Sequence, residues 1–120
     1  MQHLPIYLYN SLLIRKEMKI RKPADCTCAD EIRAEIDRID RKILSLFSER
    51  HLYIEEIVKF KNDCESVIAI DRKKCVIAQR KKWAAELGLN ADTFEKMYNL
   101  LIESNIKHEL EILNKTRNHV

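Results

Sequence analysis

Glycine and proline are nearly absent from this chain of 120 residues, which contains one glycine and two prolines. Hairpins and tight turns need residues that tolerate a positive φ or supply a fixed one, so a fold rich in such turns is excluded. Long apolar runs are also missing, because no segment approaches the roughly 20 apolar residues that a membrane span needs. The sequence therefore predicts an all-α protein of long helices with few connections, and no membrane partner.

A strong excess of charge of one sign is lacking as well. The chain carries 22 basic and 19 acidic residues, mixed throughout, for a net charge of +3. Nucleic-acid-binding proteins usually concentrate basic residues on one face, so we interpret 72–74 and 80–82 as solvated helix surface and expect no nucleic-acid partner. The cysteines do not have zinc-site spacing, since Cys26 and Cys28 are separated by one residue and no second pair follows. Reduced thiols, a cytoplasmic location and no metal are expected.

The N-terminal segment differs from the rest of the chain. An apolar stretch, MQHLPIYLYNSLLI, is followed by basic residues, whereas a secretory signal peptide places its positive charge before the apolar run. We expect residues 1–26 to be a poorly ordered extension. Residues 27–117 are expected to form one helical domain.

Three helices (long, medium, long) are predicted within this domain. The first runs from a capping pair, Thr27 and Asp30, to about residue 62, and a short polar break is expected from Asp63 to Ser66. The second helix spans about 70–87 and the third about 91–115. Gly88 is placed to end the second helix and Asn90 to cap the third. The first helix would be about 50 Å long, which exceeds a globule of this size and favours packing against a partner chain. Its apolar stripe consists of Ile32, Ile36, Ile39, Ile43, Leu46, Ile54 and Ile57.

Charged residues occupy positions on the apolar stripes. Arg50 and Lys61 return to the direction of the stripe of the first helix, Lys61 to within about 20°. Glu109 lies on the stripe of the third helix, and Asn105 precedes it by one turn. Cations are rarely buried without a partner. An anionic ligand, a buried ion pair with Glu109, or extension of both cations to solvent would each account for them.

Arg33 does not fit a site built from one chain. It lies 28 residues before Lys61, which is about 42 Å along a straight helix. We therefore expect Arg33 to join the same pocket only from another subunit.

The segment IRAEIDRIDRKILSLFSER, followed by VKFK, resembles the first helix of the all-α (type II) chorismate mutases. That family has an arginine at the helix start, an arginine 17 residues later and a lysine 11 residues after that, and here these are Arg33, Arg50 and Lys61. Arg72 in AIDRKK matches the arginine that opens the second helix, and Glu109 falls where the family has a glutamine. The resemblance covers about residues 24–115.

The resemblance implies an intertwined helical homodimer with two equivalent sites, each taking Arg33 from the partner chain. It implies rearrangement of chorismate to prephenate in aromatic amino-acid biosynthesis (the shikimate pathway), with Lys61 and Glu109 as catalytic residues at the ether oxygen. This reaction is pericyclic, so it needs orientation and charge stabilisation but no nucleophile, metal or cofactor. The expected substrate-binding residues are Arg33, Arg50, Arg72 and Asn105.

Two departures from the family leave a second activity open. Glu109 donates a hydrogen bond only when protonated, unlike glutamine, and Lys73 stands where many bacterial mutases carry an acidic residue. The segments PADCT, IDRID and RKKWAAELGL, with ten residues between Lys61 and Arg72, resemble the isochorismate-pyruvate lyases. Those enzymes release salicylate and pyruvate from a similar pocket. A branch acting on 4-amino-4-deoxychorismate is a further alternative.

A third interpretation is a helical dimer that regulates or binds another protein and catalyses nothing. In that case Arg50, Lys61 and Glu109 would form only an internal ion-pair network.

Overall fold

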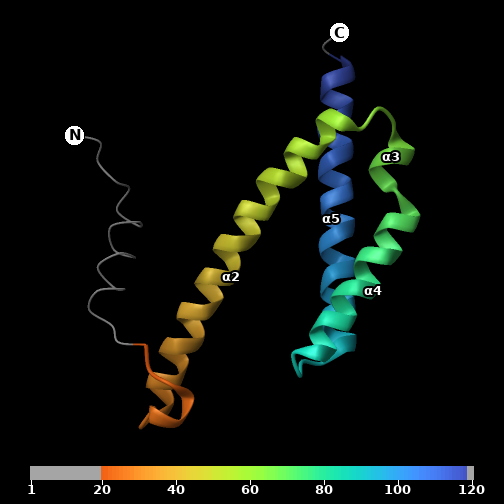
Figure 1. Cartoon of the computed structure of the whole chain (residues 1–120). Helices are drawn as coiled ribbons and strands as arrows, with labels where there is room; N and C mark the ends of the chain where they lie inside the picture. The colour runs from red at the N-terminus through yellow and green to blue at the C-terminus, as the bar shows by residue number, and fades with distance from the viewer. Residues whose placement is uncertain (1–19, 119–120) are drawn as a thin grey trace, which may run out of the picture. The chain divides into compact units, whose positions relative to one another are not determined.

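The computed structural model describes residues 20–118, and nearly all of them are helical (Figure 1). The elements are the short helices η1 (Pro23–Asp25), η2 (Val58–Phe60) and α3 (Cys64–Ile68) and the long helices α2 (Ala29–Ile57), α4 (Ile70–Glu86) and α5 (Ala91–Asn118). No strand occurs in this described range, so the all-α prediction is confirmed. Within the same range no helix combines the length and apolar character needed to cross a bilayer. Most of the predicted extension, residues 1–19, lies outside the described residues.

The chain divides into two compact units, residues 1–46 and 47–120, with the division inside α2. In the first unit, α2 begins at Ala29, and Asp30 and Glu31 lie in its first turn, where carboxylates favour the helix dipole. The hydroxyl of Thr27 donates to the carboxylate of Glu31. The predicted pair of Thr27 with Asp30 is therefore wrong, because Asp30 pairs with Arg33 at 3.1 Å instead.

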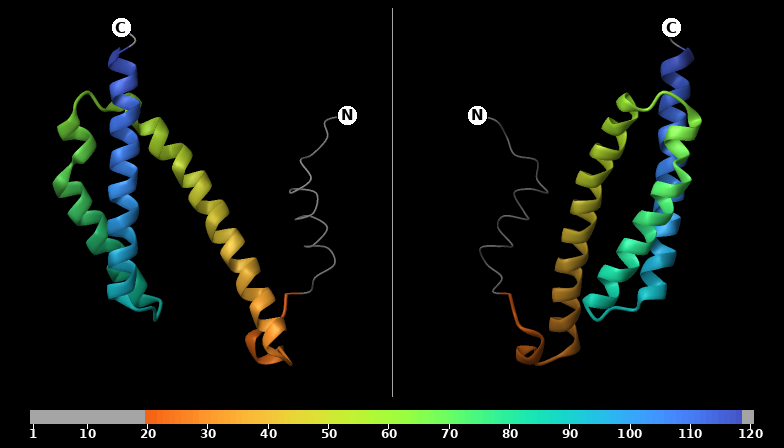
Figure 2. Two further views of the ribbon diagram at one scale, coloured as in Figure 1. Left: turned by 180° about the vertical axis from the view of Figure 1, so that it is seen from behind. Right: turned by 45° about the vertical axis from the view of Figure 1, so that its right-hand side comes forward.

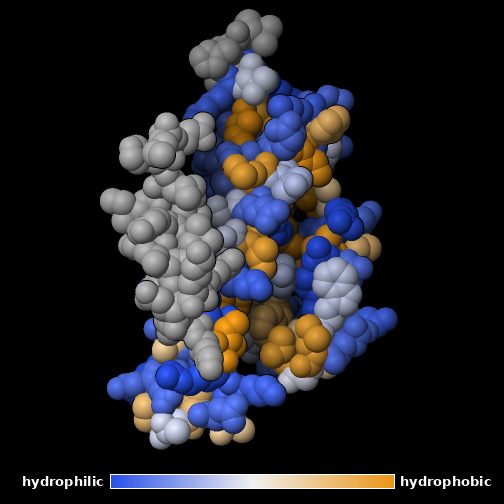
Figure 3. Space-filling model, turned by 60° about the vertical axis from the view of Figure 1, so that its left-hand side comes forward, coloured by the Kyte–Doolittle hydropathy of each residue, from blue (hydrophilic) through white to orange (hydrophobic). Residues whose placement is uncertain are grey.

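The apolar stripe of α2 remains about half exposed. Apolar side chains are visible among charged ones on the face drawn in Figure 3. The exposed fractions of the stripe residues in the first unit lie between 43% and 56%: Ile32, Ile36, Ile39, Ile43 and Leu46. A contiguous apolar stripe of this length is typical of an interaction surface.

In the second unit, α4 runs antiparallel along α5, and α3 and η2 also contact α5 (Figures 1 and 2). A small core forms where η2, α3 and α5 meet. Its buried residues are Val58, Val67 and Leu113, with Ile106, Leu110 and Ile112 packed around them. This core anchors the end of α2 to the C-terminal half of α5.

The connection between α2 and α4 differs from the prediction of one helix to residue 62. Here α2 ends at Ile57, and Lys61 has extended backbone angles (φ −113°, ψ 126°). The reason is a capping box: the Asp63 side chain accepts from the backbone N–H of Ser66, which starts α3 within the predicted polar break. Because Asp63 must be extended to cap α3, the preceding helix has to stop.

The turn between α4 and α5 agrees with the prediction. Gly88 has a φ of 75°, and the N–H groups of Gly88 and Leu89 donate to the carbonyls of Ala85 and Ala84, as in a Schellman motif. The Asn90 side-chain oxygen accepts from the N–H of Thr93 at 2.9 Å, which confirms the predicted cap.

Ala69, between α3 and α4, is in the left-handed region with a φ of 39°. We expect Ala69→Gly to raise the free energy of unfolding by up to about 1 kcal/mol. Glycine removes the Cβ clash at this positive φ, and part of that gain is lost because glycine also increases the conformational entropy of the unfolded chain. Ala78→Gly, at an exposed position inside α4, should lower the free energy of unfolding by about 0.5–1 kcal/mol. The free energy of unfolding of both variants is measured by urea unfolding followed by circular dichroism. A loss in Ala69→Gly as large as that in Ala78→Gly would contradict backbone strain at Ala69.

Candidate functional site

Four of the predicted site residues come together in the second unit, and we call them the cation cluster: Arg50, Lys61, Asn105 and Glu109. Arg50 lies in the C-terminal part of α2, and Lys61 follows η2. Asn105 and Glu109 are four residues apart on α5, so they lie on one face of that helix. Both are buried, with exposed fractions of 7% and 4%.

Lys61 and Glu109 form an ion pair. The Nζ of Lys61 donates to Oε1 of Glu109 at 2.7 Å, and the two side chains are 19% and 5% exposed. A carboxylate with this little exposure requires a compensating charge. Of the two cations that the sequence offered as partners for Glu109, the structure pairs it with Lys61.

Arg50 contacts Asn105. With the Asn105 amide oriented so that its oxygen faces the guanidinium, that oxygen accepts from Nη1 of Arg50 at 2.7 Å and from Nη2 at 3.2 Å. The fork of Arg50 is thereby held in one orientation by a neutral partner. No carboxylate of residues 20–118 forms an ion pair with Arg50, so its charge is left for another group to balance.

The pKa of Arg50 is shifted by its surroundings. Burial lowers the pKa of the Arg50 guanidinium and the cation of Arg80 lowers it further, against opposing effects of Tyr98 and Glu109. Arginine nevertheless stays protonated in proteins. Arg50 and Lys61 share one carboxylate, Glu109, so the cation cluster carries surplus positive charge and suits an anionic ligand.

Arg80 is the residue that sequence reasoning missed. It had been assigned to solvated helix surface, but its guanidinium lies over the ring of Trp83, 4.7 Å from the centroid, and 6.0 Å from that of Tyr98. The aromatic faces hold a cation whose field reaches Arg50. The spacing of Arg80 and Trp83, three residues apart on one helix, was the available signal.

Arg72 and Arg33 are not brought to the cation cluster. Arg72 is exposed near the start of α4. Its neighbour Lys73 pairs with Glu103 on α5 at 3.5 Å instead. Arg33 belongs to the first unit, where its side chain is 73% exposed and pairs with Asp30.

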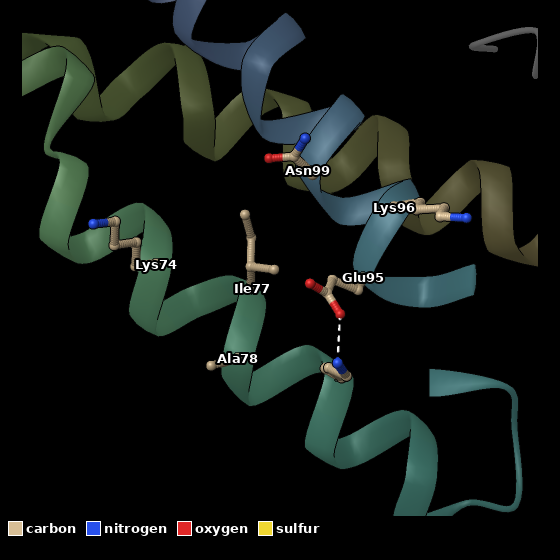
Figure 4. A pocket seen from close by; sticks show the side chains of 7 residues that line it. Lys74, Ile77, Ala78, Glu95, Lys96 and Asn99 are labelled. Atoms are coloured by element: carbon tan, nitrogen blue, oxygen red, sulfur yellow. Dashed lines mark ion pairs between the residues drawn. The ribbon is translucent and has the colours of Figure 1, made fainter. Parts of the chain in front are cut away.

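A separate groove of about 500 Å³ lies between α4 and α5 (Figure 4). Lys81, on α4, pairs across it with Glu95 on α5 at 2.6 Å. It is lined by Lys74, Ile77, Ala78, Lys81, Glu95, Lys96 and Asn99. None of the predicted site residues is among them, so this groove and the cation cluster are different places.

The chain matches the family model described as chorismate mutase type II over residues 32–110. It is 31% identical over 98 residues to an isochorismate pyruvate lyase of Pseudomonas aeruginosa, an alignment that covers 82% of this chain and 97% of that protein. It is 32% identical over 89 residues to a chorismate mutase of Methanocaldococcus jannaschii, covering 73% of this chain and 90% of that protein. The matched family range includes every residue of the cation cluster and also Arg33 and Arg72.

We expect Glu109→Ala to lower the free energy of unfolding by about 2–3 kcal/mol, because it leaves the cations of the cluster without a buried counter-ion. Glu111→Ala, at an exposed position on the same helix, should change it by no more than about 0.5 kcal/mol. Both are measured by chemical unfolding at one protein concentration. A loss of similar size in the two variants would show that Glu109 contributes no more than a surface carboxylate.

Proposed function

We propose that this chain, which belongs to the type II chorismate mutase family, rearranges chorismate to prephenate. The observation that carries the proposal is the cation cluster: two cations and one buried carboxylate within the range that matches the family. The reaction breaks a C–O bond and forms a C–C bond within one molecule. It therefore asks the protein for orientation and for charge stabilisation, and for no cofactor.

Arg50 is proposed to bind a carboxylate of the substrate. A guanidinium offers two parallel N–H donors that match the two oxygens of a carboxylate. Asn105 holds Arg50 in the cluster without neutralising it. The incoming carboxylate would supply the missing negative charge.

Lys61 and Glu109 are proposed to act at the ether oxygen, where negative charge develops as the C–O bond breaks. The ammonium of Lys61 has three N–H donors, so the bond to Glu109 leaves others for the substrate. Glu109 fixes the position of Lys61, and when protonated it adds a second donor to the oxygen. Preorganised donors of this kind act most strongly where water is excluded.

The working form is proposed to be an intertwined homodimer in which Arg33 reaches the partner's cation cluster. Two observations support this. The apolar stripe of α2 is about half exposed in the single chain, and within residues 20–118 the ion-pair partner of Arg33 is the exposed Asp30. Burying such a stripe stabilises association by roughly 25 cal/mol per Å² of apolar surface. Arg72 is proposed to line the pocket only in the ligand-bound dimer.

The family resemblance supports a place in aromatic amino-acid biosynthesis and a cytoplasmic location as part of the same proposal. The place in that pathway depends on the mutase activity.

Isochorismate-pyruvate lyase activity is the second candidate. The specific observation in its favour is the alignment with the lyase of Pseudomonas aeruginosa, which spans 97% of that protein. Lys73 favours it too, since it replaces the acidic residue of many bacterial mutases. The same cation cluster would bind the substrate in either case.

The test is to incubate the purified chain separately with chorismate and with isochorismate, following prephenate (as acid-formed phenylpyruvate) and salicylate. We expect turnover of chorismate with little salicylate, lost in Lys61→Ala and kept in Lys59→Ala, since Lys59 is 70% exposed and pairs locally with Glu56. Dominant formation of salicylate would replace the mutase proposal by the lyase. No turnover by a folded dimer would favour the regulatory dimer.

The origin of Arg33 is tested by mixing two inactive variants, Arg33→Ala and Arg50→Ala. If Arg33 serves the partner's site, each mixed dimer has one site with both arginines intact. Random reassociation of equal amounts makes half of the dimers mixed, so activity should recover to about a quarter of wild type.

The control for this experiment mixes Arg50→Ala with Lys61→Ala. Arg50 and Lys61 of one site come from the same chain, so each site of a mixed dimer lacks either Arg50 or Lys61. No recovery of activity is therefore expected. If Arg33 serves the site of its own chain, the mixture of Arg33→Ala and Arg50→Ala would also stay inactive, which would overturn the shared site.

A further inference from the structure

Two histidines and a glutamate converge beside the cation cluster, and we call them the imidazole cluster: His51, Glu55 and His108. His51 and Glu55 are four residues apart on α2 and therefore share a face, while His108 comes from α5. The Nε2 of His108 lies 3.1 Å from Oε2 of Glu55, and the Nε2 of His51 lies 3.9 Å from Oε1. The two imidazole rings are stacked, with centroids 4.8 Å apart.

The geometry of the imidazole cluster is close to that of a metal site. One ligand atom from each residue lies within 4.8 Å of the others. A tetrahedral zinc ion with bonds of about 2.0–2.1 Å holds its ligand atoms about 3.3 Å apart. Rotation of the imidazole rings and the carboxylate would close the remaining difference. The side chains are 34–48% exposed, so an ion can enter from solvent.

We propose that His51, Glu55 and His108 bind a divalent transition-metal ion, with Zn²⁺ the ion that the ligand set fits best. Two imidazole nitrogens and one carboxylate oxygen are ligands that zinc prefers, and three protein ligands leave a fourth position for water. Two stacked imidazoles and one carboxylate favour such an ion over Ca²⁺ or Mg²⁺, which take mainly oxygen ligands.

The position of this site has a consequence for the cation cluster. His51 follows Arg50 in the chain and His108 precedes Glu109. A bound ion would tie the C-terminal part of α2 to α5 at the residues next to those that the proposed function uses. The inference itself rests on the imidazole cluster alone and does not require that function.

The sequence had predicted no metal, on the spacing of its cysteines. The histidines gave no signal, because His51 and His108 are 57 residues apart and meet only where α2 and α5 pack.

The test is isothermal titration of Zn²⁺ into the tag-free full chain after treatment with a chelator. We expect one site per chain whose affinity falls at least about tenfold in each of His51→Gln, Glu55→Gln and His108→Gln. Glu56→Gln, at the adjacent carboxylate, and His119→Gln, outside the described residues, are the controls and should bind like wild type. These side chains are exposed enough for the ligand variants to fold, which circular dichroism checks.

Thiols also bind zinc, so Cys26→Ser with Cys28→Ser is titrated in parallel, and Co²⁺ is used as a spectroscopic probe. Binding that survives the cysteine variant, with Co²⁺ broadening the NMR signals of two histidines, supports the imidazole cluster. No binding at 100 µM Zn²⁺, or binding lost in the cysteine variant and kept in His108→Gln, would overturn it.

Discussion

The second unit depends on the ion pair between Lys61 and Glu109. A carboxylate that is 5% exposed needs a counter-charge close by, and Lys61 supplies it from a position 48 residues away in the chain. It can do so because α2 stops at Ile57 and the backbone turns to an extended conformation. The same stop places Val58 in the core with Val67 and Leu113. The core and the ion pair therefore both depend on the end of α2 at Ile57.

Arg50 is the group that this arrangement leaves unbalanced. Glu109 is taken by Lys61, and Asn105 orients the guanidinium without neutralising it. In the proposed dimer, the carboxylates of the substrate restore the charge balance, and Arg33 of the other chain adds a third cation beside Arg50 and Lys61. Association along the apolar stripe of α2 would bring Arg33 to the pocket of the other chain, and the substrate would bind in that pocket.

Local patterns predicted the connections that local chemistry controls. Gly88 and Asn90 ended and capped helices where expected, because a left-handed residue and a side-chain cap act within one turn. The end of α2 was predicted wrongly, since the pair of Asp63 and Ser66 was interpreted as a polar break when it is a capping box. Arg80 was missed because its aromatic partners come from two different helices, α4 and α5.

The sequence by itself determined the helices, the charges placed on their apolar stripes and the family that those charges resemble, because each is a matter of spacing along one chain. Only the tertiary structure decided that Lys61 pairs with Glu109, that Arg50 is left to Asn105, and that His108 meets His51 and Glu55. The reason is that these contacts depend on how the end of α2 is rotated against α5. Periodicity along a single helix shows which residues share a face, and carries no information about which residues of another helix that face will meet.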